Sequence, residues 1–194
     1  MTERRIAIVL GAGAGERMGG PKALLVVEGE PLASVHARRM REAGCTEVVL
    51  VTRTDLVGRL APLGDLVVAS VAPDPAGSLA VALRALSLAA DDLLVITPVD
   101  AWPARPGTIA LLLDAVRAGA GAATPRFGGR GGHPVVARAR VFEGFTDAPR
   151  PLRDVLAALG AARARLDVDD SSVVVDLDAP ADVVAATGTP PRFA

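Results

Sequence analysis

Residues 11–22 concentrate more glycine than a helix or a strand tolerates. The stretch reads Gly-Ala-Gly-Ala-Gly-Glu-Arg-Met-Gly-Gly-Pro-Lys and follows directly on the apolar run 6–10. Each glycine inside a helix or strand costs about 0.5–1 kcal/mol relative to alanine. The apolar run is short and rich in β-branched residues, which is typical of a buried strand. We therefore predict a strand followed by a loop whose backbone bends tightly or approaches a ligand closely.

The same loop carries the chemistry of an anion site. Successive backbone N–H groups in a glycine-rich turn form a concave surface that binds anions, and Arg17 and Lys22 add two positive charges. Lys22 is the only lysine beside twenty arginines, and an ammonium is not interchangeable with a guanidinium where several phosphate oxygens converge. The pattern predicts a triphosphate cradle, with a flexible surface loop and a solvated lysine as the alternative.

Two well-known phosphate loops do not fit these residues. A Walker loop needs Gly-Lys-Ser/Thr, whereas Lys22 lies between Pro21 and Ala23. The dinucleotide fingerprint needs Gly-x-Gly-x-x-Gly, and counting from Gly11 or Gly13 ends on a residue other than glycine. Both motifs fail on spacing.

The stretch from Leu10 to Leu25 resembles the loop Leu-Ala-x-Gly-x-x-x-Arg-Met-Gly-x-x-Lys of nucleotidyltransferases, with Gly11 where alanine is usual. The resemblance is greatest to the MobA/MocA-like family, the molybdenum-cofactor cytidylyl- and guanylyltransferases. It implies a Rossmann-like sheet of the nucleotide-diphospho-sugar transferase type. It also implies catalytic roles for Arg17 and Lys22. The nucleotide contacts that it implies in this loop are Leu10, Gly11, Ala12, Gly13, Gly15, Arg17 and Lys22.

Length and composition favour one α/β domain. The chain has 194 residues, enough for one domain with a full core; we assign residues 1–187 to it and expect a frayed tail at 188–194. Apolar residues make up 51%, with four Phe, one Trp and no Tyr. Such a core of Val, Leu, Ala and Ile is typical of buried parallel strands.

Charge and cysteine content exclude several classes of protein. The net charge of −1 argues against a nucleic-acid or a membrane partner. One cysteine, Cys45, allows no intrachain disulfide. The sequence contains no apolar span of 18 residues and no signal-peptide pattern, so we expect a cytoplasmic protein.

Strands alternate with helices along the chain, which predicts a doubly wound, mostly parallel sheet. The predicted strands are 6–10, 48–51, 66–69, 93–96, 121–124 and 134–137, with further extended segments at 24–27, 166–168 and 173–177. The predicted helices are 31–43, 55–61, 79–86 with Ser78 as N-cap, 108–118, 151–159 and a short one from Pro180. In a doubly wound order the first strand lies between the second and the fourth, and ligands bind at that reversal.

This topology places Asp100, which follows the fourth strand, beside the glycine loop. A carboxylate next to a phosphate cradle is suited to hold Mg²⁺; a simple turn residue is the alternative. The segment Pro98-Val99-Asp100-x-x-Pro103 also resembles the magnesium-binding stretch of the same family. We therefore assign Asp100 a catalytic, metal-binding role.

The family resemblance implies further contacts. A bend followed by Ser-Leu and Ala-Leu implies nucleoside contacts from Gly77, Ser78 and Ala82, with helix capping as the alternative for Gly77 and Ser78. Gly-His-Pro-Val resembles a motif near the acceptor site of the cytidylyltransferase-like branch, which implies that His133 binds the acceptor. Arg126 and Arg130 are candidates for an acceptor phosphate, or solvated surface charges.

The ending Asp-Leu-Asp-Ala-Pro-Ala-Asp resembles the family's Asp-Ile-Asp-Thr-Pro-Glu-Asp. It implies a second metal contact from Asp176 or Asp178, and we assign it to Asp178. Asp182 is better explained as a carboxylate at a helix N-terminus, worth about 0.3–1 kcal/mol.

The sequence thus predicts a Mg²⁺-dependent enzyme that transfers NMP from CTP or GTP to a phosphorylated acceptor, most closely a molybdopterin-type cofactor, and releases pyrophosphate. An acceptor phosphate is largely ionised at neutral pH, because its second pKa is about 6, so no general base is needed. The alternatives are a cytidylyltransferase for a sugar, polyol or phosphonate, and a nucleotide-binding subunit without turnover. The base, the acceptor and the oligomeric state stay open.

Overall fold

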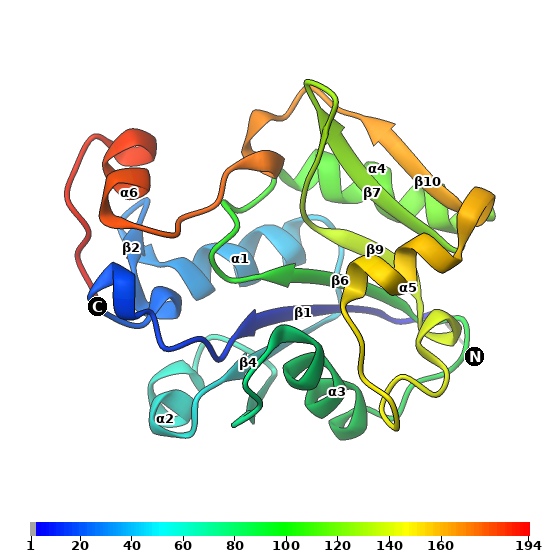
Figure 1. Ribbon diagram of the computed structural model, residues 1–194, viewed down its shortest axis with the longest axis horizontal. Helices are drawn as coiled ribbons and strands as arrows, with labels where there is room; N and C mark the ends of the chain where they lie inside the picture. Colours follow the sequence, from blue (N-terminus) through cyan, green and yellow to red (C-terminus); the bar gives the residue numbers. More distant parts are fainter. Residues whose placement is uncertain (1–2) are drawn as a thin grey trace.

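One sheet with two apolar faces organises the computed structural model, which describes residues 3–194. Its eight strands follow the order β10-β7-β9-β6-β1-β4-β5, and β8 pairs with β7 alone (Figure 1). The strands are β1 (Arg5–Gly11), β4 (Glu47–Thr52), β5 (Leu66–Ala69), β6 (Leu93–Pro98), β7 (Ala122–Phe127), β8 (Arg130–Gly131), β9 (Val135–Arg138) and β10 (Arg163–Asp167). A separate small hairpin pairs β2 (Val26–Val27) with β3 (Glu30–Pro31).

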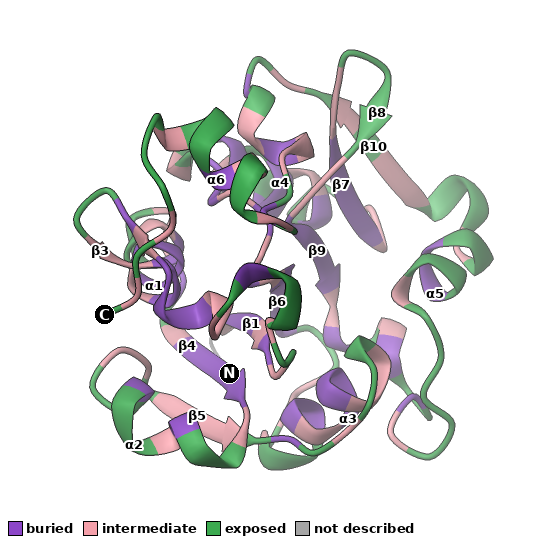
Figure 2. Cartoon of the chain, turned by 60° about the vertical axis from the view of Figure 1, so that its left-hand side comes forward, coloured by how far each residue is buried: buried purple, intermediate pink, exposed green. Residues whose placement is uncertain are grey.

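Helices cover both faces of the sheet. Along β1, Ala7 and Val9 belong to one apolar cluster, while Ile6 and Ile8 belong to the other. This alternation follows from the two-residue period of a strand. The first cluster packs under α1 (Leu32–Glu42), α2 (Val57–Leu60), α4 (Pro106–Arg117) and α6 (Pro180–Thr187), and the second under α3 (Pro75–Ala85) and α5 (Leu152–Ala158). Figure 2 shows β4, β7 and β9 buried and the edge strands β5 and β10 partly exposed.

The predicted fold class is confirmed. β1 lies between β4 and β6 and runs parallel to both, with Leu10 opposite Val51 on one side and Pro98 on the other. Strand β9 is antiparallel to β6 and β7, so the sheet is mostly but not wholly parallel. The carboxyl ends of β1 and β6 therefore meet at one edge, as the predicted topology requires.

Helix α3 begins earlier than predicted. It starts at Pro75, and its N-cap is Asp74, whose side chain accepts a hydrogen bond of 2.8 Å from the Gly77 amide. Ser78, predicted to be the cap, lies inside the helix and is buried. Proline at the first helical position has no amide to satisfy, so Asp-Pro starts a helix better than the later serine.

Two other segments differ from the prediction. Residues 173–177, predicted to be extended, form a short 3-10 helix (Ser171–Val174) and then a single bridge between Asp176 and Ala101. Strand β7, predicted to end at residue 124, continues to Phe127 and turns into β8 through Gly128 and Gly129, which both have positive φ. Glycine adopts this conformation without steric cost, so it closes a tight hairpin.

We expected a frayed carboxyl-terminal tail, but its last residues form backbone hydrogen bonds with the segment after the glycine loop. The Val26 amide donates to the Arg192 carbonyl at 2.7 Å, and the Ala194 amide donates to Leu24 at 2.9 Å. Phe193 packs against the first apolar cluster. Within residues 3–194, no helix is both long and apolar enough to cross a membrane.

Candidate active site

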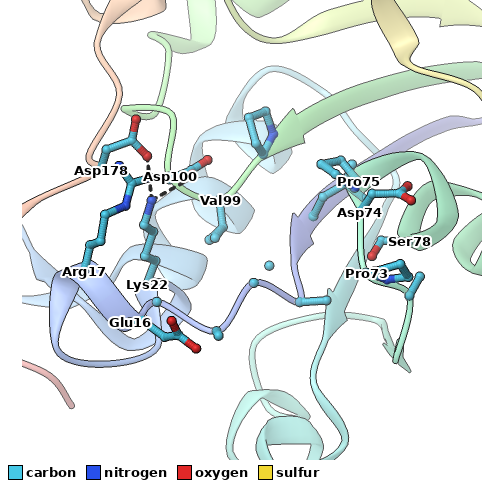
Figure 3. A pocket seen from close by; sticks show the side chains of 18 residues that line it. Glu16, Arg17, Lys22, Pro73, Asp74, Pro75, Ser78, Val99, Asp100 and Asp178 are labelled. Carbon is cyan, nitrogen blue, oxygen red and sulfur yellow. Dashed lines mark hydrogen bonds and ion pairs between the residues drawn. The ribbon is translucent and has the colours of Figure 1, made fainter.

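A cleft of about 620 Å³ opens at the carboxyl ends of β1 and β6. It is lined by Leu10, Gly11, Ala12, Gly13, Ala14, Gly15, Glu16, Arg17, Lys22, Ala72, Pro73, Asp74, Pro75, Ser78, Pro98, Val99, Asp100 and Asp178. Figure 3 shows two groups of side chains: Arg17, Lys22, Asp100 and Asp178 at one end, and the residues around Asp74 at the other. The glycine loop runs along the cleft between them.

The glycine loop has the backbone geometry of an anion site. Gly15 and Gly19 have φ values of 69° and 82°, and a Cβ on Gly15 would clash with the Gly20 carbonyl, so the first of these positions requires glycine. Among residues 3–194, no acceptor receives a hydrogen bond from the amides of residues 12–15. Four successive amides without a protein partner are therefore available to phosphate oxygens.

Lys22 joins two carboxylates at one end of the cleft. Its Nζ lies 2.9 Å from Asp100 Oδ2 and 2.9 Å from Asp178 Oδ1, and its side chain is only 15% exposed (Figure 3). Burial lowers the pKa of Lys22, but the hydrogen bonds to Asp178 and Asp100 outweigh that effect and raise it above its ordinary value. The hydrogen bond from Lys22 in turn lowers the pKa of Asp178. Lys22 and Asp178 are therefore charged at neutral pH.

Backbone pairing brings the two aspartates together from distant parts of the chain. The Leu177 amide donates to the Asp100 carbonyl at 2.8 Å, and the Trp102 amide donates to Val175 at 2.8 Å. Asp178 follows directly and reaches the cleft, whereas Asp176 is exposed and does not line it. Of the two candidates for a second metal contact, Asp178 is the one beside Asp100.

The two carboxylates fit a divalent cation that is shared with a substrate. Both have an oxygen within 2.9 Å of the same Nζ atom, so their negative charge converges on one point. Among residues 3–194, no group of three or more His, Cys, Asp or Glu side chains forms a complete metal site. Mg²⁺ is commonly held by one or two carboxylates together with substrate phosphates, which matches this donor set.

A buried histidine contacts the backbone on both sides of Asp100. His36 on α1 is 1% exposed, and its Nε2 lies 3.2 Å from the Val99 carbonyl and 3.0 Å from the Ala101 carbonyl. Burial lowers the pKa of His36 to about 4, so the ring is neutral at physiological pH. Its Nδ1 is buried without a hydrogen-bond partner in the described residues, so Nε2 carries the proton and donates to the two carbonyls.

Most of the predicted site residues line the cleft, but Gly77, Ala82 and His133 do not. Ala82 lies on the buried face of α3 and belongs to the second apolar cluster. Gly77 faces Ala72, since a Cβ there would come within 2.7 Å of the alanine Cβ. Neither residue lines the cleft, and a nucleoside contact from either of them stays a prediction.

The residues predicted to bind the acceptor, which are His133, Arg126 and Arg130, also lie outside the cleft. His133 lines a second cavity next to the cleft, and burial lowers its pKa. Arg126 forms two hydrogen bonds of 2.7 Å to Asp167, and Arg130 is exposed on β8; neither lines a cavity. The solvated-charge alternative therefore fits both arginines.

Sequence reasoning missed Asp74. It lines the cleft and caps α3 at the same time. Asp followed by Pro at a helix start was the available signal, but the helix was predicted to begin four residues later.

The chain has the fold and the cleft of a doubly wound α/β nucleotide-binding enzyme. Residues 7–165 match the family model of the MobA-like NTP transferase domain. The chain therefore belongs to the MobA-like NTP transferase family and is a nucleotidyltransferase. No curated protein matches its sequence significantly.

Solved structures share the fold at low sequence identity. Rv0371c from Mycobacterium tuberculosis is 23% identical with a TM-score of 0.81, over 97% of this chain and 100% of that chain; a second structure of Rv0371c is a complex with manganese (21%, TM-score 0.77, 96% and 99%). A nucleotidyl transferase from Methanothermobacter thermautotroptrophicus is 19% identical with a TM-score of 0.78, over 96% and 97%. The 4-diphosphocytidyl-2C-methyl-D-erythritol synthase from Anaerococcus prevotii is 14% identical with a TM-score of 0.75, over 96% and 97%.

Proposed function

We propose that the protein transfers NMP from CTP or GTP to a phosphorylated small molecule in a Mg²⁺-dependent reaction. The observation that carries this proposal is the convergence of Lys22, Asp100 and Asp178 at one end of a cleft whose other wall is a loop of free amides. Positive groups for a triphosphate and carboxylates for a metal then lie side by side, and both are needed for phosphoryl transfer.

In the proposed reaction an oxygen of the acceptor phosphate attacks the α-phosphorus of the NTP. The bond from the α-phosphorus to the bridging oxygen breaks, and pyrophosphate leaves with that electron pair. The amides of residues 12–15, Arg17 and Lys22 bind and orient the triphosphate. Asp100 and Asp178 would hold Mg²⁺, which neutralises charge on the phosphates when bound. No protein group has to remove a proton, because the acceptor phosphate is already ionised.

The base is read, in this proposal, near Ala12 and Asp74. Both line the cleft, and Asp74 lies at the end away from Lys22, where Pro73, Pro75 and Ser78 are its neighbours. Asp74 offers a carboxylate that can accept hydrogen bonds from the amino group of cytosine or guanine.

For the acceptor, the family favours a molybdopterin-type cofactor. A cytidylyltransferase for a sugar or polyol phosphate is the second candidate, because one structural neighbour is a 4-diphosphocytidyl-2C-methyl-D-erythritol synthase. A subunit without turnover is disfavoured by the presence of Arg17, Lys22 and Asp100 in one cleft. A cytoplasmic location stays a prediction from the sequence.

The test is a panel of the four NTPs against phosphorylated acceptors, scored for pyrophosphate release with and without Mg²⁺. We expect release with CTP or GTP, with one acceptor class and only with a divalent metal. Release without acceptor, or from all four NTPs equally, would contradict a shaped nucleotide site.

A further inference from the structure

A second cavity of about 540 Å³ adjoins the cleft. It is lined by Leu10, Asp74, Pro75, Ala76, Leu79, Ile96, Pro98, His133, Pro149, Arg150, Pro151, Leu152 and Arg153. Leu10, Asp74, Pro75 and Pro98 line both the cavity and the cleft. A molecule in the second cavity is therefore next to the nucleotide, on the far side of this shared wall.

The walls of this cavity are apolar. Leu10 and Ile96 come from the carboxyl ends of β1 and β6, Leu79 from α3 and Leu152 from α5. Ile96 and Leu79 belong to the core, each 1% exposed, so this surface is held rigidly. A cavity of this size accommodates a small ring-bearing ligand, since ligand pockets generally have about 300–1,000 Å³.

Three of the polar side chains that line the second cavity have few hydrogen-bond or ion-pair partners within the described residues. Among residues 3–194, Arg150 has no ion pair or hydrogen-bonded side-chain partner, and Arg153 has only a contact of 3.5 Å with the adjacent Asp154. His133 Nδ1 is buried without a hydrogen-bond partner in the same range. Two exposed guanidinium groups beside an apolar wall suit an anion that carries an apolar body.

We propose that this cavity binds the acceptor and selects an amphipathic anion: a phosphorylated molecule with an aromatic or otherwise apolar ring. The proposal rests on the proposed function and narrows it, because it disfavours an open-chain polyol phosphate. Such a chain would leave the half-buried apolar side chains of Leu10 and Leu152 without a matching surface.

Binding of three probes to the purified protein tests this: phenyl phosphate, glycerol 3-phosphate and inorganic phosphate, by calorimetry. We expect phenyl phosphate to bind at least tenfold more tightly than the other two. Arg150→Ala combined with Arg153→Ala should weaken it at least tenfold, and Ala76→Trp, which fills only the second cavity, should abolish it. Arg165→Ala is the matched control, an exposed arginine on β10 that lines neither cavity.

The outcomes separate the two proposals. Equal binding of the three probes, or binding that the Arg150 and Arg153 changes leave intact, would overturn the acceptor assignment. Displacement of phenyl phosphate by CTP or GTP in direct competition would also overturn it, because the probe would then lie in the cleft. Failure of the wild-type protein to bind any NTP would instead contradict the proposed function.

A second, independent observation concerns His36. No donor among residues 3–194 other than His36 Nε2 reaches the carbonyls of Val99 and Ala101. These carbonyls flank Asp100, so one buried ring fixes the backbone on both sides of the carboxylate. Leaving a buried carbonyl without a partner costs about 1–3 kcal/mol, so the turn would rearrange without the ring.

We infer that His36 is a positioning residue, which orients Asp100 toward Asp178 and the metal without touching either. His36→Leu should weaken metal-dependent NTP binding at least tenfold while metal-free binding stays the same. Faster amide hydrogen exchange at residues 98–102 should accompany it. His36→Gln keeps an N–H donor and should restore part of the metal dependence.

A control must separate positioning from general destabilisation. Thr108→Val removes a buried hydrogen bond of 2.8 Å to Asp170, away from the cleft. Both variants should lower the melting temperature, but only His36→Leu should change the metal dependence. Wild-type metal dependence in folded His36→Leu would overturn the inference. Absence of any metal dependence in the wild-type protein would instead contradict the metal assignment itself.

Discussion

The single lysine occupies a place that an arginine would fill poorly. Lys22 Nζ makes two hydrogen bonds of 2.9 Å to carboxylates from different segments, in a position where its side chain is 15% exposed. A compact ammonium can direct its three donors to separate acceptors, whereas a guanidinium is a flat fork that pairs best with one carboxylate. The residue type therefore follows from the shape of the site.

We predict that Lys22→Ala lowers turnover and NTP affinity at least tenfold. The change removes a charge-assisted contact worth about 1.5–3 kcal/mol and leaves Asp100 and Asp178 facing each other without a cation. Lys22→Arg should restore only part of the activity. The measurement is the NTP dissociation constant together with the rate of pyrophosphate release, and wild-type values for the alanine variant would contradict the phosphate-loop assignment.

We predict that Asp100→Asn abolishes most Mg²⁺-dependent activity and changes the melting temperature by only a few degrees. The Asp100 side chain is 33% exposed, and a substitution at such a position generally changes stability little. Asparagine retains a carbonyl oxygen but cannot neutralise the metal charge. Rate against Mg²⁺ concentration is the measurement, with Asp176→Asn as the control that should behave like the wild type. Identical curves for Asp100→Asn and the wild type would mean that Asp100 is only a turn residue.

We predict that the free energy of unfolding decreases as the pH falls below about 6.5, because His36 is buried. Burial lowers its pKa to about 4 against an ordinary value of 6.5, with Arg39 lowering and Asp100 raising it to smaller extents. Between these values the unfolded chain binds a proton that the folded protein excludes, so stability rises with pH through this window and is complete above about pH 6.5. The contribution is about 3 kcal/mol.

Urea unfolding at pH 7, 5.5 and 4.5 measures this contribution. His36→Gln has no group that titrates at this position, so its stability should change less over the window than that of the wild type. Parallel pH profiles for the two proteins would show that His36 is not held neutral by burial.

At the scale of secondary-structure elements, the connection between β8 and β9 is set by a close approach to the carboxyl-terminal segment. The His133 amide donates to the Val173 carbonyl at 2.8 Å, and a Cβ on Gly132 would clash with the same carbonyl. This contact fixes His133, and with it one wall of the second cavity.

We predict that Gly132→Ala destabilises the protein by about 1–3 kcal/mol, the usual cost of forcing atoms into a packed site. Gly131→Ala is the matched control, because a Cβ at this neighbouring position meets nothing within 4 Å. Thermal unfolding of the two variants is the measurement. Equal melting temperatures would contradict a close approach of these two segments.

At the scale of the whole molecule, the carboxyl-terminal end of the chain packs against the glycine loop and the segment that follows it. Residues 192–194 pair with residues 24–26, and the Phe193 ring lies where a Cβ on Gly20 would come within 2.8 Å of it. The carboxyl-terminal segment thus packs against this loop (Figure 1). Residues 11–17 of the same loop line the cleft.

We predict that Phe193→Ala weakens NTP binding several-fold, although the residue does not line the cleft. Loss of the ring removes the packing that limits the mobility of the loop backbone, and a more mobile loop loses more entropy when it binds a ligand. Calorimetry with CTP or GTP measures the effect. Arg192→Ala keeps the backbone pairing and is the control; equal affinities for the two variants would show that the ring does not support the loop.

The local pattern of the sequence determined the sheet and one end of the cleft. Short β-branched runs between helical stretches allow only a mostly parallel sheet, and parallel topology alone brings the loop after β1 beside Asp100 after β6. The single lysine within a glycine-rich loop was enough to predict the candidate phosphate-binding residues, because the pattern needs no distant contact to be recognised.

Tertiary structure alone decided the contacts between distant segments. Asp178 rather than Asp176 faces Lys22 because Leu177 pairs with Asp100, a register that spacing does not encode. Arg150 and Arg153 border a cavity with His133 only because α5 packs beside α3 on one face of the sheet. Periodicity specifies which face of an element is buried, but the partner across that face depends on packing of the whole chain.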